Sequence, residues 1–211
     1  MIDPDGSPLG LSKDRRRIEE RLSSDAAFDR VYDAKVRALS QEHWTPVAVA
    51  ARAARMLTDA GATQILDIGS GPGKFCIVGA LCTDARFVGV ERRQWLVGVA
   101  GQAAAEMGAS RATFVHSNID EFSFAGFDGV YLFNPFYEQI SKYVEMIDDD
   151  VERSSRAHRY FVQKIEEKLR DAEPPVAVVT YNGFGGRIPM GYRYLGDEPA
   201  GNDRLQMWIK E

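Results

Sequence analysis

Short apolar runs alternate along most of this chain with longer segments in which apolar side chains recur every three or four positions. Runs of about four to eight largely apolar residues, bounded by glycine, proline or polar clusters, predict buried strands, and the longer segments predict helices. Strands alternating with helices predict an α/β fold with a mostly parallel sheet between two helical layers. The predicted strands span residues 64–68, 86–91, 112–117, 128–133 and 176–181.

The N-terminal region precedes this alternation. Residues 1–9 are rich in Pro, Gly and Asp and predict a loose tail, whereas 11–22 and 25–39 carry helical patterns. These helices either cap a ligand cleft or pack against the sheet edge, and the sequence leaves both open. We therefore divide the chain into a tail and helical cap over 1–43 and a second domain over 44–211.

The C-terminal region predicts the end of the sheet. Residues 137–171 predict a helix, with a possible break near Asp148 to Asp150. After the fifth strand, the Gly-rich stretch 183–189 leaves no room for a long helix. Residues 192–195 and 205–210, joined by a turn over 197–202, predict a closing antiparallel hairpin.

A further helix is predicted directly before the first strand. Thr45 is the expected N-cap, Pro46 the first helical residue, and Gly61 lies just past the end. The Thr45 hydroxyl either caps this helix alone or also meets a ligand carboxylate.

A glycine-rich turn follows the first strand. Gly69, Gly71 and Gly73 have the spacing G-x-G-x-G, and Ser70 lies between the first two. Such a turn brings a ligand to exposed backbone N–H groups at a helix N-terminus. The dinucleotide fingerprint is instead G-x-G-x-x-G. Asp67 at the strand end would repel a pyrophosphate, so the turn favours a cationic ligand such as S-adenosylmethionine, with its ammonium and sulfonium groups.

Polar residues also follow the next strands. Glu91 lies close to the offset of about 20 residues at which an acidic side chain binds ribose hydroxyls in this kind of fold. Asn118 and the Ile119 backbone are placed to bind an adenine edge, and Asn134 ends the fourth strand. Ligands of open α/β sheets lie beyond the carboxyl ends of the strands, where these residues would meet. His116 is expected to be a packed strand residue rather than a catalytic base.

The composition narrows the classes of function. The net charge of −5 gives no reason to expect a nucleic-acid partner, although a local basic patch is compatible with it. The chain has no long apolar stretch and no signal-peptide pattern, so we expect no membrane insertion and a cytoplasmic location.

Cys76 and Cys82 point to different faces of one predicted helix, which disfavours a disulfide. With three histidines and no Cys/His cluster, we expect no metal site.

The segment Asp67-Ile-Gly-Ser-Gly-Pro-Gly73, followed by Glu91, Asn118 and Asn134-Pro-Phe-Tyr137, resembles the class I S-adenosylmethionine-dependent methyltransferases over residues 45–211. The resemblance implies a Rossmann-like three-layer α/β/α sandwich, in which a mostly parallel seven-stranded sheet ends in an antiparallel hairpin. It also implies extra N-terminal helices, S-adenosyl-L-methionine as cofactor and S-adenosyl-L-homocysteine as product. Arg92 stands where the family often has an apolar residue against adenine.

Residue roles follow from this resemblance. Asp67 and the glycine turn would surround the methionine moiety, Glu91 the ribose hydroxyls, and Asn118 with the Ile119 backbone the adenine. The expected cofactor-binding residues are Thr45, Asp67, Gly69, Ser70, Gly71, Gly73, Glu91, Arg92, Asn118, Ile119 and Asn134.

Asn134-Pro-Phe-Tyr137 resembles the Asn-Pro-Pro-Tyr/Phe motif of amino-methylating members, with Phe136 in place of the second proline. In that motif the Asn side-chain oxygen and the next carbonyl accept hydrogen bonds from the acceptor amine, while an aromatic residue covers a planar acceptor. The expected catalytic residues are Asn134, Pro135, Phe136 and Tyr137.

We therefore expect a methyltransferase acting on an amino nitrogen, less readily an oxygen, of a small-molecule or protein acceptor. Three alternatives remain at this stage. The chain could bind the cofactor without catalysis as a partner subunit, methylate a nucleic-acid base, or be a nicotinamide-dependent oxidoreductase.

Overall fold

The computed structural model describes residues 9–143, 146–149, 151 and 153–211. Its sheet has seven strands in the order β3-β2-β1-β4-β5-β7-β6. The first five strands are mutually parallel, and β7 runs antiparallel to both of its neighbours. The strands are β1 (Gln64–Ile68), β2 (Arg86–Glu91), β3 (Ala112–His116), β4 (Gly129–Leu132), β5 (Val176–Tyr181), β6 (Arg193–Ala200) and β7 (Asp203–Lys210).

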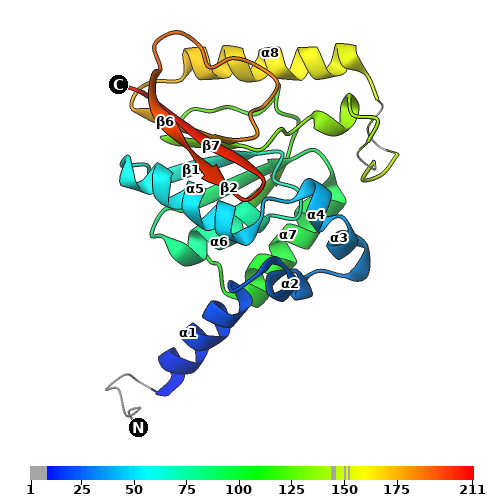
Figure 1. The fold of residues 1–211 in the computed structure, drawn as a ribbon, viewed down its shortest axis with the longest axis vertical. Helices are drawn as coiled ribbons and strands as arrows, with labels where there is room; N and C mark the ends of the chain where they lie inside the picture. Colours follow the sequence, from blue (N-terminus) through cyan, green and yellow to red (C-terminus); the bar gives the residue numbers. More distant parts are fainter. Residues whose placement is uncertain (1–8, 144–145, 150, 152) are drawn as a thin grey trace.

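Two helical layers enclose this sheet, as the alternating sequence pattern predicts, and α8 lies across the face opposite α5 and α6 (Figure 1). Side chains on one face of the sheet share a core with α5, α6 and α7, whereas those on the other pack against α8. The helices are α1 (Leu9–Arg21), α2 (Asp25–Phe28), α3 (Ala34–Ala38), α4 (Ser40–His43), α5 (Val47–Asp59), α6 (Lys74–Cys82), α7 (Gln94–Met107) and α8 (Ser155–Asp171), with 3₁₀ turns η1 (Asp29–Val31) and η2 (Tyr137–Gln139).

Strand alternation decides which face each residue of β1 serves. Ile65 packs into the core with α5 to α7, while Leu66 and Ile68 pack into the core with α8. Asp67 therefore points to the same side as Ile65, toward α6, where it meets Cys76. Both cysteines are free, as expected.

The N-terminal region is more broken than predicted. The expected helix over 25–39 starts as predicted, with Ser24 as its N-cap, but is divided into α2, η1 and α3, because Asp33 caps a new helix by accepting from the Val36 N–H. Figure 1 shows α1 extending away from the rest of the molecule. Of the predicted tail, residues 1–8 lie outside the described residues.

The start of α5 also differs from the prediction. Pro46 is the N-cap, and the first amide of the helix, at Val47, donates to the Asp25 carboxylate at 2.8 Å. Thr45 instead shares a 3.1 Å hydrogen bond with the buried Tyr131 hydroxyl. A side chain from α2 thus replaces the local cap, while Gly61 follows the helix as predicted, with φ +95°.

The predicted helix over 137–171 is wrong in its first half. Of the residues described there, 137–139 form only the η2 turn, and α8 begins at Ser155, capped by Ser154. The predicted break included Asp150, which lies outside the described residues.

The hairpin strands are longer than expected, because β6 continues to Ala200 and leaves a turn at Gly201-Asn202. Residues 117–128, all of them described, form no helix, and His116 is exposed rather than packed.

A buried lysine joins the N-terminal helices to the glycine turn. Lys74, the first residue of α6, is 2% exposed, and its ammonium lies 2.8 Å from Asp29 and 2.7 Å from Asp25. It also donates to Ser40 at 3.1 Å. Three N-terminal elements therefore converge on one cation.

We expect Asp29→Ala to lower the free energy of unfolding by about 3 kcal/mol, because it removes a buried partner of a buried charge. Urea denaturation measures this change. Glu19→Ala is the matched control: its partner Arg15 is 3.4 Å away, and both side chains are largely exposed. The control should cost less than about 1 kcal/mol. Equal losses in the two variants would contradict a structural role for the Lys74 cluster.

Candidate functional site

The glycine turn passes from β1 to α6 with its backbone in left-handed conformations. Gly69 has φ +74° and Gly71 has φ +54°, values that side chains rarely adopt. A Cβ at Gly69 would lie 2.9 Å from Pro135, and one at Gly71 would lie 2.7 Å from the Trp44 ring. The turn is thus held between the end of β4 and the N-terminal region.

Asp67 is a buried carboxylate beside this turn, 4% exposed. Burial raises its pKa from 3.8 to about 7; the hydrogen bond from the Cys76 thiol, at 3.4 Å, opposes the rise, and the Glu91 charge adds to it. A buried carboxylate with this pKa loses its proton readily when a cation binds beside it.

Glu91 is the second buried carboxylate. It accepts hydrogen bonds from the Gly71 N–H at 3.1 Å and the Arg93 N–H at 2.8 Å. Burial raises the pKa of Glu91, and these two hydrogen bonds and the Arg93 charge partly offset the rise. Each carboxylate oxygen retains a lone pair, so the side chain can fix the turn and still accept from a ligand hydroxyl.

Three neighbouring cavities open around Gly69, with volumes of about 500, 320 and 700 Å³. We name them after one polar residue each: the Asn118 cavity, the Asp67 cavity and the Asn134 cavity. Gly69 lines all three, and Glu91 lines the first and third.

Nearly all predicted site residues line these cavities. Arg92, Asn118, Ile119 and Phe136 line the first; Thr45, Asp67 and Ser70 the second; Gly71, Asn134 and Tyr137 the third; Pro135 lines the first and third. Gly73 is different, because a Cβ there would meet Phe114 and Ala100 on the protein's interior side.

Asn134 is held at the end of β4 by backbone contacts. Its φ is +39°, its N–H donates to the Gly183 carbonyl at 2.8 Å, and its carbonyl accepts from the Tyr137 N–H at 3.1 Å. The Gly-rich loop after β5 therefore fixes the residue that the motif predicts to be catalytic.

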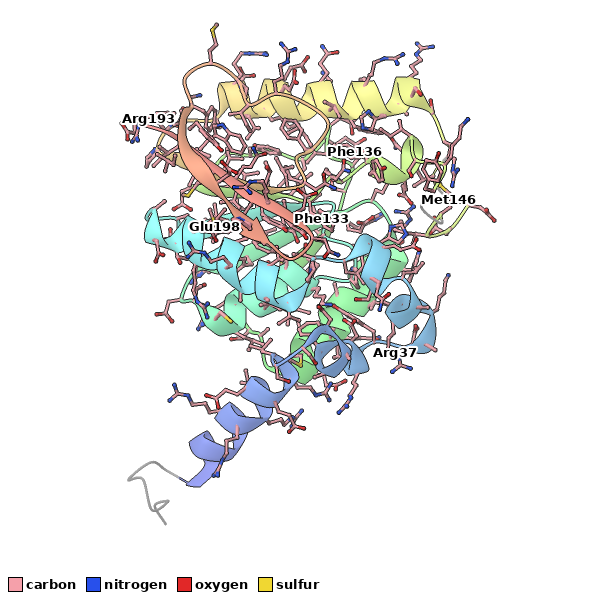
Figure 2. The ribbon with its side chains drawn as sticks, in the orientation of Figure 1. Arg37, Phe133, Phe136, Met146, Arg193 and Glu198 are labelled. Carbon is pink, nitrogen blue, oxygen red and sulfur yellow. The ribbon has the colours of Figure 1, made fainter. Side chains whose placement is uncertain are left out.

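Phe136 lies where the motif alone did not place it. Its ring packs against Phe161 of α8, with centroids 5.3 Å apart, and Phe136 lines the Asn118 cavity. Figure 2 shows the Phe136 side chain beneath α8. Tyr137 is the aromatic residue of this motif that lines the Asn134 cavity.

Several cavity residues were missed by sequence reasoning. Arg93 donates to Glu138 at 2.8 Å and to Asp148 at 2.9 Å, which ties the segment after β4 to the start of α7. Trp95 also donates to Asp148, at 2.8 Å. From the N-terminal side, Glu42, His43 and Trp44 line the Asn134 cavity. Only tertiary structure brings these residues together, so no local sequence signal marks them.

The described residues contain neither a metal-binding cluster nor a membrane-spanning helix. No group of three or more His, Cys, Asp or Glu side chains among them is arranged to hold a metal ion. In the same part of the chain, no helix has both the length and the apolar character needed to cross a membrane.

Comparison with known proteins identifies the family of this chain. A family model described as a methyltransferase domain matches residues 59–170. The match includes the glycine turn, Glu91, Asn118 and Asn134. No curated protein matches the chain.

Solved structures share the fold at low sequence identity. An RNA methyltransferase from Salinibacter ruber, in complex with S-adenosyl-L-homocysteine, is 20% identical, with a TM-score of 0.56 over 79% of this chain and 92% of that one. Magnesium protoporphyrin IX methyltransferase from Synechocystis PCC 6803, with bound S-adenosylmethionine, is 14% identical, with a TM-score of 0.56 over 94% and 97%. TrmN from Thermus thermophilus is 17% identical with a TM-score of 0.61; the match covers 88% of this chain and about half, 53%, of TrmN.

The raised pKa of Asp67 predicts a pH dependence of stability. Between about pH 4 and pH 7, Asp67 retains its proton in the folded ligand-free protein but releases it in the unfolded chain. The free energy of unfolding therefore falls as the pH rises through this range. Above the folded-state pKa of about 7, Asp67 is ionised in both states and its contribution becomes constant. One pKa unit is worth about 1.4 kcal/mol, which sets an upper bound of roughly 4 kcal/mol.

Urea denaturation of wild type and Asp67→Asn from pH 4 to 8 isolates this effect. The stability of Asp67→Asn relative to wild type should increase up to about pH 7 and then stay constant. A difference independent of pH would show that Asp67 has an ordinary pKa.

Proposed function

This chain belongs to the methyltransferase domain family and is an S-adenosylmethionine-dependent methyltransferase, and we propose that its acceptor is an amino nitrogen of a small molecule or protein. The observation that carries the proposal is the position of Asn134, which shares one cavity with Gly69, Gly71 and Glu91. An acceptor beside Asn134 would lie next to a cofactor held by the glycine turn.

The residues present fit the cofactor. S-adenosylmethionine supplies an electrophilic methyl group on its sulfonium. We assign its ammonium to the Asp67 cavity, where the buried carboxylate is a suitable partner, and its ribose hydroxyls to Glu91. The Ser70 hydroxyl, also in the Asp67 cavity, is buried and has no hydrogen-bond partner within the described part of the chain, which supports a polar ligand there.

The role proposed for this chain's residues is positioning. The Asn134 side-chain oxygen and the Pro135 carbonyl would accept hydrogen bonds from the acceptor N–H groups and so direct the nitrogen lone pair toward the methyl group. Holding the two atoms in line removes much of the entropic barrier, and no general base is required for that step. Tyr137 and Trp44 would pack against the acceptor, because both line the same cavity.

The N-terminal region belongs to this proposal as a cap. Glu42, His43 and Trp44 line the Asn134 cavity, and the Trp44 indole donates to the Val36 carbonyl at 3.0 Å, which fixes the ring over the glycine turn. We propose that residues 1–43 form a tail and cap on the methyltransferase domain of residues 44–211. On this division, Trp44 opens the domain and lies directly under the cap.

We expect Glu91→Ala to weaken S-adenosylhomocysteine binding by roughly 10-fold to 100-fold, because hydrogen bonds to a charged group contribute about 1.5–3 kcal/mol. Isothermal calorimetry measures the dissociation constant. Glu173→Ala removes an exposed carboxylate elsewhere and should leave binding unchanged. Wild-type affinity in Glu91→Ala would rule out its role at the ribose.

We expect Asn134→Gly to lower kcat by about 100-fold while S-adenosylhomocysteine affinity stays within about threefold. Turnover is measured as methyl transfer from labelled S-adenosylmethionine to a panel of amines, phenols, peptides and nucleosides. Glycine suits the φ of +39°, so backbone strain cannot cause the loss, as it might in Asn134→Ala. Unchanged turnover in Asn134→Gly would refute amino methylation through this motif.

A further inference from the structure

Gln139 is a buried polar residue in the wall of the Asn118 cavity. It ends the η2 turn directly after the Asn134-Pro-Phe-Tyr137 motif and is 4% exposed. Its backbone N–H donates to the Phe136 carbonyl at 3.0 Å, which fixes the residue in place. Neither the glycine turn nor the motif predicts a role for it.

One polar atom of the Gln139 side chain lacks a partner within the described part of the chain. Its Oε1 atom is buried and accepts no hydrogen bond from any of the described residues. Leaving such an oxygen unpaired costs about 1–3 kcal/mol, and most buried polar atoms are hydrogen-bonded, so this oxygen points to a partner from outside the described residues. The adjacent Glu138 is paired only in part: its Oε1 accepts from Arg93 at 2.8 Å, whereas its Oε2 is also buried without a partner among the described residues.

Aromatic and aliphatic side chains share the wall of this cavity with charged ones such as Glu91, Arg93 and Glu138. Phe136 and Phe161 stack at 27° to one another, and Ile119 is buried at 5% exposure. The other carboxamide, Asn118, is an exposed residue. A wall that combines a stacked aromatic pair with a buried amide suits a planar heterocycle that carries its own hydrogen-bonding edge.

We propose that Gln139 recognises the adenine edge of the cofactor, with Oε1 accepting from the 6-amino group and Nε2 donating to the neighbouring ring nitrogen. A carboxamide presents an acceptor beside a donor, and adenine presents the matching donor beside an acceptor, which is why Gln and Asn pair bidentately with adenine. The inference rests on the proposed function: with the ribose on Glu91, which also lines the Asn118 cavity, the adenine would extend into that cavity. It makes Gln139 a specificity-determining residue beyond Asn118.

The test compares two ligands by calorimetry: S-adenosylhomocysteine and the analogue whose adenine is replaced by purine, which lacks the 6-amino group. Wild type should bind S-adenosylhomocysteine about tenfold tighter than the analogue. Gln139→Met keeps the length of the side chain but removes both polar groups. It should bind S-adenosylhomocysteine about tenfold more weakly and distinguish the two ligands by less than about twofold.

Two further variants separate recognition from a structural role. Gln139→Glu keeps an acceptor oxygen and should restore a preference for the 6-amino group. Gln102→Met, on an exposed position of α7, is the matched control and should keep the wild-type ratio. Thermal unfolding confirms that each variant is folded.

The outcomes distinguish this inference from the function on which it rests. Equal affinity of wild type for the two ligands overturns the role of Gln139 and needs no variant. The role of Gln139 is also overturned if Gln139→Met binds both ligands more weakly by the same factor, so that the ratio of the two affinities stays at the wild-type value. If wild type bound no S-adenosylhomocysteine at all, the cofactor assignment itself would fail.

Discussion

The carboxylates of Asp67 and Glu91, buried on either side of the glycine turn, are the constraint on which the site depends. Burial raises the pKa of both groups, and both remain close to backbone that only glycine adopts easily. Glu91 holds the turn through the Gly71 N–H, while Asp67 is a carboxyl group near the end of β1 that can ionise when a cation binds beside it. A pyrophosphate would add negative charge to this pair, whereas an ammonium neutralises part of it.

Contacts from distant segments maintain the shape of the three cavities. Lys74 gathers the N-terminal helices against the first turn of α6, and Arg93 holds the segment after β4 through Glu138 and Asp148. Both cations are nearly buried, so each ion pair is much less screened than a surface pair. Lys74 lines the Asp67 cavity and Arg93 lines the other two, so different networks fix the walls of these cavities.

The sequence was sufficient for the sheet and for most of the cavity residues, because both depend on local signals. An apolar run that ends in glycine or a polar residue marks where a parallel strand stops, and Asp67, Glu91 and Asn134 occupy those ends. The predicted helix over 25–39 was wrong because Asp33 caps a new helix within a continuous apolar pattern. Gln139, Arg93 and Trp44 were out of reach, because their positions depend on contacts between segments far apart in the chain.

The central claim is that the glycine turn with its buried carboxylates selects a cationic cofactor over a dinucleotide. Calorimetric titration of the wild-type protein with S-adenosylhomocysteine and, separately, with NAD tests it most directly. We predict one-to-one binding of S-adenosylhomocysteine and no heat of binding with NAD. Binding of NAD, with none of S-adenosylhomocysteine at millimolar concentration, would contradict the account.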